Sequence, residues 1–167
     1  MAELVQQERL QPSLLDRLTD DEPSRPAESR EQRVLSMSRL RESVLRDVGW
    51  LFNSVQLEAT EDLDAYPEVA RSVLNFGVPA MAGVHVIGRD LQALEAAITE
   101  AIHRFEPRIL PDSMSVKVAM RAEDLTRRAM TFTIEGLLWA QPVPQSLFLK
   151  TELDLETGTV RVADTSR

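Results

Sequence analysis

Histidine is the first residue type to examine for acid–base or metal chemistry, because its side chain titrates near neutral pH. The chain contains only two, His85 and His103. His85 lies between two valines in a predicted loop, and His103 lies near the end of a predicted helix, where the helix dipole favours the charged imidazolium. The two do not share a metal-ligand spacing. We therefore expect a structural role for each and no metal site.

Paired carboxylates are the remaining route to enzymatic chemistry. Glycoside hydrolysis needs two acids about 5–10 Å apart, one of them protonated, and with 27 acidic residues some pair meets that spacing by chance. Glu106 is the obvious candidate, because it stands between an apolar helix and Pro107. However, Arg108 follows two residues later and would favour the ionised carboxylate. We expect no catalytic residue, and a peptidoglycan hydrolase that uses Glu106 remains as an alternative.

Motifs for nucleophilic and cofactor chemistry are missing from the sequence. The chain has no cysteine, which excludes disulfides, thiol nucleophiles and cysteine-ligated metals. It contains no Gly-x-Ser-x-Gly elbow, no Walker loop and no Gly-x-Gly-x-x-Gly motif, and its six glycines leave little material for phosphate-binding loops. We therefore expect no cofactor.

The charge of the chain argues against nucleic acid and membranes as partners. With 27 acidic and 19 basic residues the net charge is −8, and such a chain is repelled by phosphate backbones and anionic lipids. No apolar run approaches the roughly 18 residues needed to span a bilayer. The first residues do not resemble a secretory signal. The sequence thus predicts a cytoplasmic protein of 167 residues with one main domain.

The sequence predicts helices for the first half of the main domain. Apolar residues recur every three or four positions from Met37 to Val55, which predicts a long amphipathic helix. A short helix is predicted from Pro67, capped by Asp64 or Ala65 and ending at Gly77 in a left-handed cap conformation. A third helix follows Arg89-Asp90 and is stopped near Arg104 by Pro107, with a buried face made of Leu91, Leu94, Ile98, Ala101, Ile102 and Phe105.

Beyond Pro111 the apolar period changes to two, which is typical of half-buried strands. Strands are predicted over 114–120, 132–138, 147–155 and 160–162, with a tight turn at 156–158 before the last of them. The predicted fold is therefore α+β over residues 33–167, with N-terminal helices packed on a C-terminal antiparallel meander of about four strands.

Residues 1–32 differ from this domain. They contain a short amphipathic stretch with Leu14, Leu15 and Leu18, and residues 19–32 have two prolines, several acids and no large apolar side chain. Such a composition predicts a flexible leader. The three leucines are expected either to dock onto a partner or to fold back onto the core of this domain.

Four blocks of sequence resemble one known family. Residues 102–109 read Ile-x-x-Phe-Glu-Pro-Arg-Ile and are followed by an alternating strand, which is similar to the baseplate wedge proteins of contractile tails. The stretches 13–18 (SLLDRL), 44–54 (VLRDVGWLFNS) and 66–77 (YPEVARSVLNFG) match in order and spacing. The first of these blocks favours the TssE branch, from bacterial type VI secretion, over its phage counterparts.

The resemblance implies structural work in an assembly. Partners implied are the wedge proteins TssF and TssG, the sheath subunits TssB and TssC and, through the wedge, TssK, at the cytoplasmic face of the inner membrane. It also implies that Glu106, Pro107 and Arg108 make assembly contacts. An internal Glu106–Arg108 brace of the helix-to-strand turn is the alternative reading of these residues, and a regulatory adaptor of the same fold is an alternative function.

A second contact is expected from the meander itself. An open antiparallel sheet leaves unpaired backbone groups on its edge strands. Residues 159–163 are predicted to form such an edge, onto which an extended sheath segment adds as a further strand.

Overall fold

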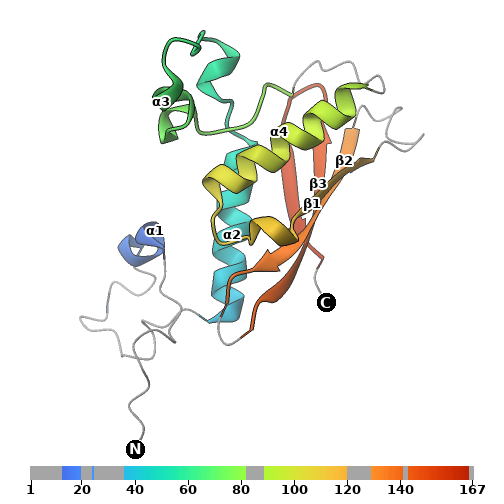
Figure 1. Ribbon diagram of the computed structural model, residues 1–167. Coiled ribbons are helices and arrows are strands. Elements are labelled where there is room, and N and C mark those ends of the chain that lie inside the picture. The colour runs from blue at the N-terminus through green and yellow to red at the C-terminus, as the bar shows by residue number, and fades with distance from the viewer. Residues whose placement is uncertain are drawn as a thin grey trace, which may run out of the picture.

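The computed structural model describes residues 13–19, 24, 36–81, 89–119, 129–140 and 143–165. Two long helices, α2 (Met37–Phe52) and α4 (Arg89–Phe105), pack against one face of a four-stranded antiparallel sheet (Figure 1). The predicted α+β fold is confirmed. Most of the predicted leader, and the candidate His85, lie outside the described residues.

Helix α2 forms because its apolar residues share one stripe and its first turn is capped. Ser36 is the N-cap, and its hydroxyl accepts a hydrogen bond from the Arg39 amide at 3.2 Å. The helix ends at Phe52, with Asn53 as C-cap. The buried stripe contains Leu40, Ser43, Val44, Val48, Leu51 and Phe52. Val55 was predicted to extend this stripe and is instead 58% exposed, because the chain turns away from the helix at Asn53.

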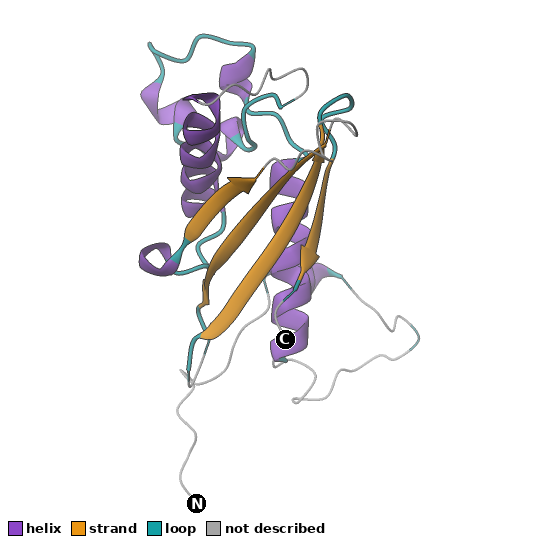
Figure 2. Ribbon diagram, turned by 90° about the vertical axis from the view of Figure 1, so that its right-hand side faces the viewer, coloured by secondary structure: helices purple, strands orange, loops and turns teal. Residues whose placement is uncertain are grey.

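The sheet has the strand order β1-β2-β3-β4, and Figure 2 shows the strands side by side. Its members are β1 (Ser115–Ala119), β2 (Ala129–Leu138), β3 (Gln145–Asp154) and β4 (Val160–Asp164). All neighbours are antiparallel, so the predicted meander of four strands is confirmed. Gly158 has a φ of 72° in the turn before β4, where the Asp154 carboxylate accepts hydrogen bonds from the Glu156 and Thr157 amides.

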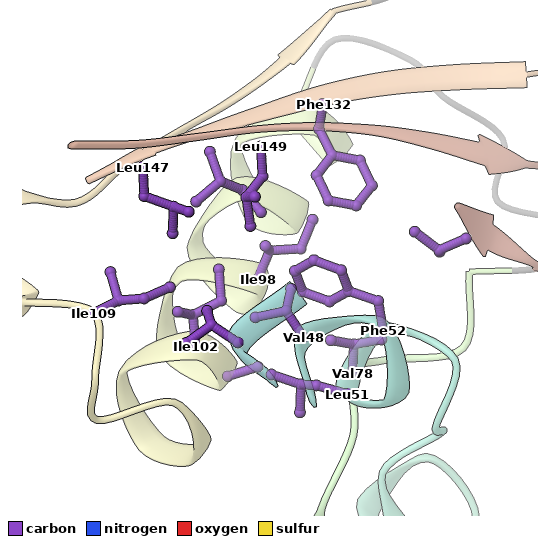
Figure 3. Packing of buried hydrophobic residues seen from close by; sticks show 14 of the residues in the cluster. Val48, Leu51, Phe52, Val78, Ile98, Ile102, Ile109, Phe132, Leu147 and Leu149 are labelled. Carbon is purple, nitrogen blue, oxygen red and sulfur yellow. The ribbon is translucent and has the colours of Figure 1, made fainter. Parts of the chain in front are cut away.

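The core lies between the helices and the sheet (Figure 3). Phe52 of α2 meets Phe132 of β2 edge to face, with ring centroids 5.4 Å apart. Ile98 and Ile102 of α4 are fully buried beside them. On β3, Leu147, Leu149, Thr151 and Leu153 are buried and alternate with exposed residues, which gives the sheet one buried and one solvated face.

Between the helices the chain makes an excursion, residues 55–77, that is closed at a narrow neck. The Val78 amide donates to Ser54 O at 2.9 Å, and the Gln56 amide donates to Val78 O at 3.1 Å. Gly77 has a φ of 136°, and a Cβ there would lie 2.4 Å from Ser54 O. Glycine is therefore required at this close approach of two backbone segments.

The helix that was predicted to begin at Pro67 and to end at Gly77 is shorter in the structure. The excursion contains η2 (Leu57–Ala59), α3 (Pro67–Ala70) and η3 (Val73–Asn75). The N-cap is Tyr66, without a side-chain hydrogen bond, and neither Asp64 nor Ala65 caps the helix. The helix stops at Ala70 and not at Gly77. The Ser72 hydroxyl caps a separate 3-10 turn, and the side-chain amide of Asn75 donates a hydrogen bond to the Ala70 carbonyl at 3.0 Å.

Candidate functional site

The candidate residues Glu106, Pro107 and Arg108 form the turn between α4 and the sheet. The Glu106 amide still donates to Ile102 O, and Pro107, which has no N–H, ends the helix. Arg108 O then accepts from the Trp139 amide at 2.7 Å, next to the end of β2. The turn is thus fixed to the helix on one side and to the sheet on the other.

The Arg108 guanidinium is surrounded by groups of its own chain. Its Nε donates to Glu106 Oε1 at 2.6 Å, and one terminal nitrogen bonds to both Glu106 Oε2 and Asp47 Oδ2. The other terminal nitrogen donates to Ser43 Oγ at 3.1 Å. Burial alone would lower the pKa of Arg108, but the hydrogen bonds and charges of Glu106 and then Asp47 outweigh it and raise that pKa. The guanidinium therefore remains charged at any working pH.

These contacts have the geometry of the internal brace. The Glu106 side chain is 3% exposed and that of Arg108 is 23% exposed, so the fork predicted to bind a partner carboxylate is filled by Glu106 and Asp47 in this chain. Pro107 is exposed. The part of the turn that a partner can reach is thus the Pro107 ring and the rim of the guanidinium, and the assembly role of the three residues stays a prediction.

The same geometry bears on the hydrolase alternative. A general acid for glycoside hydrolysis must be protonated and must reach the substrate oxygen. The Glu106 carboxylate is buried, and both of its oxygens bind the Arg108 guanidinium, so it does not reach a substrate. Within the described segments no group of three or more histidines, cysteines and acids is arranged to hold a metal ion.

The charges around Arg108 continue to the leader. Asp47 Oδ1 accepts from Arg46 Nε at 2.9 Å, and a terminal nitrogen of Arg46 donates to Asp16 Oδ1 at 2.6 Å. We call this row of alternating charges (Asp16, Arg46, Asp47, Arg108 and Glu106) the charge chain. Through it α1 (Leu14–Leu18) is attached to α2 and, indirectly, to the turn after α4.

Helix α1 exposes its leucines. Leu14 is 71% exposed, Leu15 42% and Leu18 75%, and the helix buries no residue completely. Helix α1 contacts the domain through its polar side. The Ser13 hydroxyl caps the helix by accepting a hydrogen bond from the Asp16 backbone amide. The Asp16 carboxylate pairs with Arg46, whose guanidinium lies 5.2 Å from the centre of the Trp50 ring. Of the two expected placements, the leucines do not fold back onto the core, and they are presented to solvent.

We predict that α1 is held by the ionised form of Asp16. Burial would raise the pKa of Asp16, but hydrogen bonds from Ser13 and Arg46 and the Arg46 charge lower it below its ordinary value of 3.8. A lowered pKa stabilises docking above pH 3.8, and this stabilisation is lost as the pH falls through the lowered value. Asp16→Asn should therefore weaken docking at neutral pH, by about 1 kcal/mol for a partly exposed pair.

The measurement is the NMR chemical shift of the Leu14, Leu15 and Leu18 methyl groups at pH 7. In Asp16→Asn these shifts should move toward the values of an unstructured leader. Glu42→Gln is the matched control, since it removes an exposed carboxylate from α2. Equal shifts in both variants, or none in either, would contradict the prediction.

Sequence reasoning missed the two residues of α2 that complete the site. Asp47 and Ser43 lie 61 and 65 positions before Arg108, and no local pattern predicts such a contact. The available signal was their spacing of four residues, which places two polar side chains on one side of the helix next to the apolar stripe.

Other features of the described residues suggest no small-molecule site. The cavity bounded by Phe52, Val78, Met81 and Gly158, among others, has a volume of only 80 Å³. His103 is half-buried in the last turn of α4. In these segments no helix combines the length and the apolar character that crossing a membrane requires.

Of three comparisons with known proteins, one identifies a family. A family model described as baseplate wedge protein gp25 matches residues 38–143. A solved structure from Geobacter sulfurreducens, provisionally described as a tail lysozyme, is 18% identical, with a TM-score of 0.47 over 70% of this chain and 92% of that chain. No role passes from that protein to this one at such a score. None of the curated proteins compared with the chain matched it.

Proposed function

The chain belongs to the baseplate wedge protein gp25 family, and from this membership we propose that it is a TssE-type subunit of the type VI secretion baseplate. The family's part in the contractile-tail baseplate is structural. In this proposal the protein is not an enzyme. It binds the wedge proteins TssF and TssG at the cytoplasmic face of the inner membrane, reaches TssK through them, and helps the TssB–TssC sheath to begin polymerising.

The observation that carries the proposal is the exposed face of α1. Three leucines on one short helix lie outside the core, while an ion pair to Arg46 fixes the helix on the domain. Exposed apolar side chains held in a defined place are typical of a protein-binding surface. The sequence of this segment, SLLDRL, is also the block that resembles TssE more than its phage counterparts.

In this proposal the turn after α4 forms a second, rigid part of the surface that the wedge proteins bind. The charge chain fixes the side chains of Glu106 and Arg108 on either side of Pro107. The exposed Pro107 ring is therefore held in one orientation. We propose that TssF and TssG contact Pro107 and the rim of Arg108, and that Glu106 acts by keeping this surface in place.

The sheath contact is proposed for the edge of β4. This strand pairs on one side with β3, and β4 is the last strand of the sheet in its described part. Antiparallel edges bind extended segments through their backbone hydrogen bonds. Strand addition would join the first sheath subunits to this chain without requiring a pocket.

Val162→Pro tests the sheath contact in cells that carry a fluorescent sheath subunit. Proline cannot donate a backbone hydrogen bond, and edge strands tolerate it where the N–H faces outward. We expect Val162→Pro to remove sheath foci as completely as deletion of the gene does. Val162→Ala keeps the backbone donor and should retain the foci. Normal foci in Val162→Pro cells, with normal protein abundance by blot, would reject the proposed edge.

A further inference from the structure

Each of the two sheet edges is contacted by a side chain of the long helix next to it. In β4 the hydrogen bonds with β3 alternate: the Asp154 amide donates to Thr159 O at 2.9 Å, and the Thr165 amide donates to Phe148 O at 2.8 Å. The odd-numbered residues of β4 therefore face β3. Val160, Val162 and Asp164 present their backbone N–H and C=O groups outward, where an added strand would pair.

The outward groups of Val160 are already occupied. Asn53, the C-cap of α2, accepts from the Val160 amide at 3.0 Å and donates to Val160 O at 2.9 Å. Its second amide hydrogen goes to Gly49 O at 2.7 Å. The side-chain amide thus bonds both backbone groups of Val160, as the N–H and C=O of one paired residue on a neighbouring strand would, and both of its amide hydrogens are used.

The β1 edge carries a similar contact. Glu95 of α4 accepts from the outward amide of Val118 at 2.8 Å, and α4 packs along β1 (Figure 1). One side chain from each long helix therefore blocks one edge of the sheet. Native sheets use such devices to prevent uncontrolled strand pairing.

Val162 is the next outward residue on β4. Its backbone N–H and C=O make no outward hydrogen bond with any residue that the structure describes. At the far end of the strand, Arg41 of α2 binds the Asp164 carboxylate at 3.2 Å. Two contacts from α2 thus lie on either side of Val162.

We propose that Asn53 sets the register of strand addition to β4 by closing the edge at Val160. The inference rests on the proposed sheath contact at this edge. An added strand pairs with Val162 and ends beside Asn53, and a slip of two residues toward Val160 must first displace the bidentate amide. A slip of one residue would turn every side chain of the added strand to the opposite face.

Backbone amide hydrogen exchange of the free chain, followed residue by residue by NMR, is the first test. In the wild-type chain the Val160 amide should be protected and the Val162 amide should exchange freely. Asn53→Ala should speed exchange at Val160 by about 10-fold, as for the loss of one good hydrogen bond. Asn53→Asp keeps the acceptor and should keep the protection. Equal exchange at Val160 and Val162 in the wild-type chain would overturn the proposal without any variant.

Sheath foci separate this inference from the proposed function. Asn53→Ala protein of normal abundance and unchanged denaturation midpoint should give fewer foci than wild type, because added strands slip. Unchanged foci in Asn53→Ala cells, when Val162→Pro abolishes them, would overturn the register role and leave the sheath contact standing. Normal foci in Val162→Pro cells would reject the sheath contact, and the register role with it.

Discussion

Replacing Glu106 with alanine is expected to lower the free energy of unfolding by about 3 kcal/mol. The reason is that the Arg108 guanidinium, largely enclosed between α2 and the turn, loses its closest counter-ion and two hydrogen-bond acceptors. Breaking a buried pair by removing one member costs about 3–5 kcal/mol, and the partial exposure of Arg108 reduces that figure. A small domain is stable by only about 5–15 kcal/mol.

The measurement is urea denaturation of Glu106→Ala beside Glu100→Ala. Glu100 also pairs with an arginine, Arg104, but its side chain is 64% exposed, so its loss should cost no more than about 0.5 kcal/mol. A second comparison is the double variant Glu106→Ala with Arg108→Met. Because no unpaired charge is left, and Asp47 keeps Arg46, the double variant should lose less than the two single variants together. A loss in Glu106→Ala as small as that in Glu100→Ala would show that the brace contributes little.

Changing Leu14, Leu15 and Leu18 together to serine is expected to abolish co-purification with TssF and TssG. Burying a leucine at an interface stabilises a complex by about 1.5–3 kcal/mol, so even with ordering costs the triple change should weaken binding about 100-fold. The fold should be unaffected, since exposed positions contribute little to stability and these side chains lie outside the core.

Val73→Ser with Leu74→Ser is the matched control. These two residues are 78% and 66% exposed on the excursion between the helices, so the control removes a similar apolar surface from another place. Pull-down of the wedge pair should be retained by the control and lost by the triple variant, with equal denaturation midpoints. If both variants bind as the wild type does, the leucines are not the docking surface.

The secondary structure was predictable where burial decides it. The stripe from Leu40 to Phe52 and the alternation in β3 each bury one face, and a buried face imposes its period on the sequence. The excursion was not predictable in the same way, because few of its residues are buried. There, side-chain hydrogen bonds of Ser72 and Asn75 end the helix that the sequence pattern would have continued.

The candidate site was predictable only in its local part. Glu106 and Arg108 are two residues apart, and their pairing was foreseen as one of two readings. Asp47 and Asn53 entered the sequence analysis only as members of the block 44–54 that resembles a family. The contact of Asn53 with Val160 joins residues 107 positions apart. Contacts of that range depend on how the helices lie on the sheet, which the local pattern does not specify.

The neck at Ser54 and Val78 holds the two ends of the excursion together. Two backbone hydrogen bonds join its ends, so the chain enters and leaves at the same place whatever lies between, and the entropy of closing a longer loop grows slowly with length. We therefore expect α2, α4 and the sheet to keep their positions when residues 57–75 are lengthened or shortened. The exposed stretch at 60–62 is likewise the natural place to insert an epitope or a small fluorescent reporter.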